Sequence, residues 1–163
     1  ARAAAGFSRT GLSVLHGAMI AASVANDGTM MKPLLVRRAT RKDKVLLEPE
    51  PEALSVVMSP ETAAELEVLM LDTVESGTAR KFFYRGKRPR VPGVRIAGKT
   101  GHLSGGGALS GHYSWFVAYA PADNPEIAVA GLVVNGEVWT TKGAVIVQRL
   151  LSHYFDHKSK AAN

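Results

Sequence analysis

Three apolar, strand-like runs follow one another in the second half of this chain, with no helix-forming segment between them. They span residues 94–100, 113–120 and 127–134, and Pro121-Ala122-Asp123-Asn124-Pro125 separates the last two. Because so short a turn leaves no room for a crossover helix, the last two runs are expected to pair in antiparallel fashion. Strands bounded by helical patterns predict an α+β fold, in which helices flank an antiparallel sheet. The third run is apolar throughout, as is typical of a central strand covered on both faces.

Helical patterns lie before and after these runs. Residues 13–27 are apolar nearly all round and begin at Ser13, a favourable N-cap, which predicts a buried helix. A second helix is expected after the N-cap Ser59, with one apolar face and a stop at a glycine. Residues 143–155 are expected to form a closing helix, and the polar tail from about residue 157 to residue 163 is expected to fray.

Two surface segments lie between the helices. The apolar runs 30–38 and 45–47 surround a charged turn and are expected to form a hairpin. Residues 80–95 carry seven basic side chains and no acidic one, within a chain whose net charge is +6. No helix-turn-helix, zinc-finger or RNA-binding signature accompanies this charge, so we expect no nucleic-acid partner. A solvated basic loop beside a site for an anionic group is the simpler interpretation.

Composition narrows the class of protein further. The 163 residues are 46% hydrophobic, which suits a single folded unit over residues 1–163. There is no cysteine, so disulfides and thiolate chemistry are excluded. His153 and His157 are one helical turn apart, but no third ligand is evident, and we expect no metal or cofactor. No apolar run is long enough to span a membrane, so either the protein is cytosolic or its targeting segment lies outside this sequence.

The end of the first strand-like run is the most chemically suggestive stretch. Residues 93–100 match the spelling of a phosphate-binding loop, Gly-x4-Gly-Lys-Thr, which would make this a nucleotide-binding module. That mechanism needs a flexible loop between the glycines and a helix that begins at the lysine. The four intervening residues favour a strand, and a Gly-rich stretch follows Gly101. The phosphate-binding interpretation is therefore kept only as an alternative.

The competing interpretation is an edge strand beside an active site, to which an extended peptide could add. Gly98 and Gly101 lack the side chains that would block its approach. Lys99 would supply a positive field, and the hydroxyl of Thr100 would bind a substrate carboxylate. The backbone N–H of His102 lies where an oxyanion donor would be useful.

Ala97-Gly98-Lys99-Thr100-Gly101, together with residues 113–129, resembles the third motif and the following hairpin of penicillin-binding protein transpeptidases. Serine β-lactamases and β-lactam sensor domains share the fold of these serine D,D-transpeptidases. Residues 25–33, 59–61 and 74–79 also resemble ordered segments of the family, so the resemblance covers residues 6–155. The turn at residues 121–125 favours transpeptidases over β-lactamases. The resemblance implies the C-terminal part of a β-lactamase/transpeptidase-like domain.

The resemblance also implies roles. Lys99 would tune the electrostatics around the nucleophile and help to bind the acidic end of the substrate, which Thr100 would hydrogen-bond. His102 would give one backbone N–H to the oxyanion hole, and Gly101 would let the acyl group approach closely. The reaction would be acyl transfer from a D-alanyl-D-alanine stem peptide of peptidoglycan to a neighbouring amine, which β-lactam antibiotics would inhibit. The site would be periplasmic, at the outer face of a bacterial inner membrane, and anchored only through regions absent here.

The sequence departs from the family pattern in two ways. No serine has lysine three residues on or asparagine two residues on, so the nucleophile is expected upstream, in the missing N-terminal half of the domain. This chain alone is therefore expected to be inactive. His102 replaces the family's second threonine, which removes a hydroxyl. Ser104 and Ser110 lack the frame of a nucleophile, and Trp115 and Tyr119 are expected in the core, whereas the role of Trp139 is left open. A non-catalytic β-lactam sensor or interaction domain is the alternative on the same fold.

Overall fold

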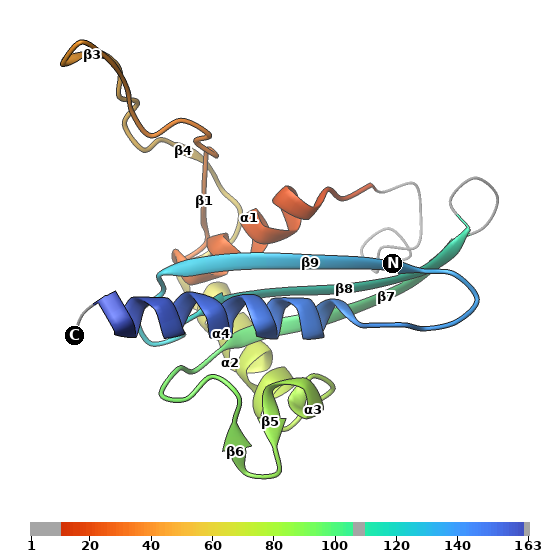
Figure 1. The fold of residues 1–163 in the computed structure, drawn as a ribbon. Helices are drawn as coiled ribbons and strands as arrows, with labels where there is room; N and C mark the ends of the chain where they lie inside the picture. Colours follow the sequence, from red (N-terminus) through yellow and green to blue (C-terminus); the bar gives the residue numbers. More distant parts are fainter. Residues whose placement is uncertain (1–10, 106–109, 162–163) are drawn as a thin grey trace.

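A three-stranded antiparallel sheet organises the molecule in the computed structural model, which describes residues 11–105 and 110–161 (Figure 1). The strands are β7 (Ala97–Gly105), β8 (Gly111–Ala120) and β9 (Ile127–Asn135), in that spatial order. Both pairings are antiparallel, and helices cover the sheet, so the predicted α+β class is confirmed. β7 begins three residues later than expected and runs past the Lys-Thr-Gly motif, because its glycine-rich end pairs with the start of β8 as far as Gly105.

The position of β9 corrects one prediction. Among the described strands β8 is the middle strand of the sheet, and β9 lies at an edge rather than at the centre. Its apolar sequence has another cause, since α1 (Val14–Ala25) and α4 (Gly143–Ala161) both contact it. Burial by helices on both faces therefore explains the continuous apolar sequence, which we had interpreted as the mark of a central strand.

The two helices lie on opposite faces of the sheet. Side chains alternate along β8, so Val117 and Phe116 point to different faces. A Cβ atom at Gly17 of α1 would lie 3.2 Å from a methyl group of Val117, which places α1 on that face at close range. Phe116 instead packs in the cluster that contains Ala144 and Val147 of α4. Ser13 caps α1 as predicted, with its side chain accepting a hydrogen bond from the backbone N–H of His16.

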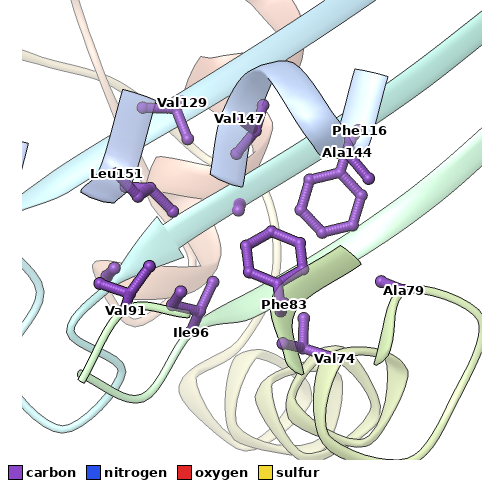
Figure 2. Packing of buried hydrophobic residues seen from close by; sticks show 12 residues of the cluster. Val74, Ala79, Phe83, Val91, Ile96, Phe116, Val129, Ala144, Val147 and Leu151 are labelled. Atoms are coloured by element: carbon purple, nitrogen blue, oxygen red, sulfur yellow. The ribbon is translucent and has the colours of Figure 1, made fainter. Parts of the chain in front are cut away.

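The larger hydrophobic core lies on the α4 face. Figure 2 shows the rings of Phe83 and Phe116 facing one another below α4, with ring centroids 5.2 Å apart. Gly143 allows the first turn of α4 to approach the sheet, because a Cβ atom there would lie 2.6 Å from the carbonyl oxygen of Ser114. α4 continues to Ala161, beyond the predicted end at residue 155. Its buried side chains include Ala144, Val147 and Leu151, whereas Leu150 is exposed.

Residues 60–89 precede β7 in the chain, and the long helix at their start packs against it. α2 (Pro60–Glu75) begins after the N-cap Ser59, as the sequence predicted, and buries side chains of both hydrophobic clusters. The basic segment is not a simple loop, because it forms the short helix α3 (Arg80–Phe83) and a hairpin of β5 (Tyr84–Arg85) and β6 (Arg88–Pro89). The ring of Phe83 is buried in the hydrophobic core and so anchors this otherwise polar segment to it.

An extended arm projects away from the sheet and helices (Figure 1). At its tip, β2 (Ala39–Arg41) pairs with β3 (Lys44–Leu47), as expected for a hairpin around the charged turn. The predicted single strand over residues 30–38 is wrong, because β1 (Thr29–Met31) pairs instead with β4 (Ala53–Val56). Within residues 11–105 and 110–161, no helix combines the length and the apolar character needed to cross a bilayer.

Candidate active site

The Lys-Thr-Gly motif lies within β7, the strand at one edge of the described sheet. Thr100 pairs in register with Phe116, and Gly101 with Trp115, so one side of β7 is occupied by β8. The predicted edge strand is therefore confirmed. Lys99 and Thr100 do not start a helix, so the backbone geometry of a phosphate-binding loop is absent here.

Lys99 and Thr100 point to opposite faces of β7, as successive strand residues do. Lys99 shares its face with Val117, its partner on β8, and Val117 faces α1. The ammonium group of Lys99 is exposed and donates a hydrogen bond to the carbonyl oxygen of Thr100, 2.9 Å away. The side chain of Thr100 lies on the other face, with Phe116. The ammonium group of Lys99 and the hydroxyl of Thr100 therefore project from opposite faces of β7.

The hydroxyl of Thr100 forms a hydrogen bond with the hydroxyl of Thr78, with 2.9 Å between the two oxygens. Thr78 lies in the turn between α2 and α3, twenty-two residues earlier in the chain. Of the two hydroxyls, one donates its proton to the other and the second keeps its own proton to donate elsewhere. The pair can therefore offer one hydrogen bond to a ligand.

A cavity of about 200 Å³ opens beside this hydroxyl pair. β7, the α2–α3 turn, α3 and the segment before α4 all contribute to its wall. Of the described residues that line it, two are lysines and none is acidic. The side chains that matter for chemistry are Thr78, Lys81, Thr100, His102, Trp139 and Lys142. The cavity can therefore bind an anionic group that also accepts hydrogen bonds.

His102 and Trp139 line the cavity and belong to an aromatic cluster that also contains His112. The ring of His102 meets that of Trp139 edge to face, with centroids 4.7 Å apart, and His112 stacks on the same indole at 5.1 Å. The ammonium of Lys142 lies 3.1 Å from the centroid of Trp139. At the position where the resemblance led us to expect a threonine hydroxyl, the imidazole of His102 thus contributes a ring contact.

Sequence reasoning missed four of these residues as site residues. Thr78 falls within a segment that resembled the family, and Lys81 falls within the basic segment for which an adjoining anion site was expected. Trp139 was left without a role, and Lys142 attracted no attention. They come together only because α3 and α4 pack on the sheet. Local sequence patterns do not predict such tertiary contacts.

Gly98 has a packing role in the structure. It is buried, and a Cβ atom there would lie 2.5 Å from the ring of Phe116. Gly101 is half-buried, and a Cβ atom there would lie 3.0 Å from the Cβ of Trp115. Gly101 borders the cavity and Gly98 does not, so the two predicted approach positions differ in their surroundings. Approach of a substrate to either glycine stays a prediction.

The other serines and histidines of interest lie outside the cavity. Ser104 contacts His112, with 3.1 Å between the hydroxyl oxygen and Nδ1, but both residues are at least partly exposed. Within the described residues, no carboxylate forms an ion pair with the imidazole of His112. Ser110 precedes β8 and is exposed. The rings of His153 and His157 lie 4.3 Å apart on α4. Among the described residues, no group of three or more His, Cys, Asp or Glu side chains could hold a metal ion.

Tyr119 and Trp115 differ in depth on the α1 face. Tyr119 is fully buried, which confirms its place in the core, and its hydroxyl donates to a carboxylate oxygen of Glu67 at 2.7 Å. Burial raises the pKa of the Tyr119 phenol well above its ordinary value, and the bond to Glu67 adds to the effect. Trp115 is only partly buried and packs beside Gly17.

Known proteins share both this sequence pattern and this fold. The family described as the penicillin binding protein transpeptidase domain matches residues 1–153. The peptidoglycan D,D-transpeptidase PbpA of Mycolicibacterium smegmatis is 37% identical over 130 residues, which cover 77% of this chain and 24% of that protein. This chain thus spans about a quarter of the length of that relative.

Solved structures agree with the sequence comparison. An imipenem acyl-enzyme complex of penicillin-binding protein A from Mycobacterium tuberculosis superposes with a TM-score of 0.76 at 30% identity, over 91% of this chain and 32% of that one. The D,D-transpeptidase domain of a peptidoglycan glycosyltransferase from Eggerthella lenta gives 0.73 at 28% identity, over 90% and 32%. Since the family match covers nearly all of the sequence, the chain belongs to the penicillin-binding protein transpeptidase domain family.

Proposed function

We propose that this chain is the C-terminal part of a peptidoglycan D,D-transpeptidase, which cross-links stem peptides ending in D-alanyl-D-alanine through a serine ester. One observation carries the proposal: a Lys-Thr-Gly motif on an exposed sheet edge, with the Thr100 hydroxyl opening into a cavity lined by cationic side chains. Substrate would lie along β7 as an added strand. The relatives named D,D-transpeptidase support the same activity.

Each motif residue has a distinct task in this reaction. The Thr100 hydroxyl hydrogen-bonds the terminal carboxylate of the peptide, and the backbone N–H of His102 stabilises the oxyanion that forms on the scissile carbonyl. Lys99, on the other face of β7, sets the electrostatic field around the attacking serine and its proton relay. Gly101 leaves room for the acyl group beside the strand. The same groups bind the carbonyl and carboxylate of a β-lactam, which then acylates the serine.

The serine itself is supplied from outside residues 1–163. The sequence holds neither Ser-x-x-Lys nor Ser-x-Asn, and α1 and α2 leave large apolar side chains exposed, which fits a surface that another part of the domain covers. Leu15 of α1 is 53% exposed, and Val68 and Leu69 of α2 are 65% and 63% exposed. Such large apolar side chains are costly to leave in water when they lie close together. The full-length protein would act at the outer face of the bacterial inner membrane, in the periplasm.

Fluorescent penicillin labelling tests the proposal. The full-length protein is compared with the 163-residue chain, and a hydroxylamine wash confirms that any label is held as an ester. Labelling of the full-length protein alone is the expected result. If the full-length protein takes no label while it binds penicillin reversibly, it is a sensor without acyl transfer, and the enzymatic proposal is wrong.

A further inference from the structure

We propose that Lys81 and Lys142, rather than Lys99, supply the positive charge that binds the substrate carboxylate beside Thr100. The ligand is the terminal carboxylate of the acyl-donor peptide, or the carboxylate of a β-lactam in its place. This inference rests on the proposed function, because it names the charge that recognises the substrate of the same site. The motif alone would assign two tasks to Lys99, namely binding of the carboxylate and the electrostatic field around the nucleophile. The inference assigns the first of these to Lys81 and Lys142.

The position of the charges is the first argument. Lys81 and Lys142 line the cavity together with Thr100, whereas Lys99 does not. Lys99 projects from the face of β7 that carries Val117, and its ammonium is bonded to a backbone carbonyl. A carboxylate that accepts a hydrogen bond from the Thr100 hydroxyl lies on the other face of the strand. It therefore meets Lys81 and Lys142 from its own side of the sheet edge.

The contacts of the two lysines are the second argument. The ammonium of Lys142 lies 3.1 Å from the ring centroid of Trp139, and that of Lys81 lies 5.2 Å from the ring centroid of Phe82. An aromatic face attracts a cation but uses none of its N–H groups in a conventional hydrogen bond. The rings thus hold each ammonium near the cavity while its donors stay available, which reduces the ordering cost of binding.

The lack of competing anions is the third argument. Among residues 11–105 and 110–161, neither Lys81 nor Lys142 forms an ion pair, and no carboxylate lines the cavity. Thr78 orients the hydroxyl of Thr100 through their hydrogen bond, so that the pair has one O–H to donate. Two ammonium groups and one hydroxyl together match the several lone pairs of a carboxylate.

The test compares acylation of the full-length protein by benzylpenicillin and by its methyl ester, which lacks the carboxylate charge. Second-order acylation rates are measured for the wild type and for Lys81→Gln, Lys142→Gln, Lys99→Gln and Lys87→Gln. Lys87 lies in the turn between β5 and β6, is exposed and does not line the cavity, so its variant controls for the loss of one positive charge. Thermal unfolding confirms that each variant is folded.

We expect the ratio of acid to ester rates to fall by about three- to tenfold in Lys81→Gln and in Lys142→Gln, as for a partly screened charged hydrogen bond. The ratio should hold in Lys87→Gln, and in Lys99→Gln both rates should fall together. If Lys99→Gln alone abolishes the preference for the acid, the inference is overturned and the proposed function stands. If neither compound acylates the wild type, the proposed function fails, and this inference fails with it.

Discussion

Replacement of Gly98 by alanine should destabilise the fold, although alanine is favoured over glycine in a folded chain on entropic grounds. The new Cβ atom would lie 2.5 and 2.8 Å from two ring carbons of Phe116, well inside van der Waals contact. The ring cannot turn away, because it is fully buried and packs on Phe83 beneath α4 (Figure 2). Overpacking of this kind costs about 1–3 kcal/mol, against an entropic gain of roughly 0.5–1 kcal/mol. The steric effect should win.

The assay is urea unfolding of the chain followed by tryptophan fluorescence, in a double-mutant cycle with Phe116→Leu. Leucine removes the ring atoms that the new methyl group would strike, so the Gly98→Ala cost should shrink by about 1–2 kcal/mol in that background. Gly136→Ala is the matched control, because no described atom beyond its two chain neighbours lies within 4 Å of its Cβ position. It should shift the unfolding free energy by less than about 0.5 kcal/mol. An equal Gly98→Ala cost in both backgrounds would refute the reasoning.

Two further predictions concern the site and the core. Thr78→Val should lower the second-order rate of penicillin acylation of the full-length protein by about fivefold, because the Thr100 hydroxyl loses its hydrogen-bond partner. Thr78→Ser keeps a hydroxyl and should retain most of the rate. An unchanged rate in the valine variant would show that the hydroxyl pair has no role in acylation. Tyr119→Phe should cost about 1 kcal/mol at neutral pH through loss of the bond to Glu67. Because burial raises the pKa of Tyr119, wild-type stability is intact below the ordinary tyrosine pKa of about 10 and falls as pH rises above it. Unfolding free energies measured from pH 8 to about pH 11.5 should show that decline weakened in the phenylalanine variant; equal slopes would contradict it.

Local patterns predicted the elements that depend on nearby residues. Ser13 and Ser59 cap their helices as expected, because a capping bond joins residues only a few positions apart. The turn at residues 121–125 joins an antiparallel pair for the same reason. The edge position of the Lys-Thr-Gly strand also followed from its composition and from the family resemblance.

Features that depend on tertiary contacts could not be predicted in this way. The glycine-rich end of β7 looked like a loop, since only its pairing with the start of β8 makes it a strand. The order of β8 and β9 in the sheet is likewise a matter of non-local pairing. The cavity brings Thr78 and Lys81, which are neighbours in the chain, together with the distant Thr100 and Lys142. These residues meet only when α3 and α4 pack on the sheet.

The most direct measurement is the location of the penicilloyl group in the acylated full-length protein by peptide mass mapping. The central claim is that residues 1–163 bind and orient the substrate while the attacking serine lies elsewhere. The penicilloyl mass should therefore map to a serine outside this segment, and the 163-residue chain alone should gain no such mass. A penicilloyl ester on Ser104, Ser110 or any other serine within the segment would contradict the account.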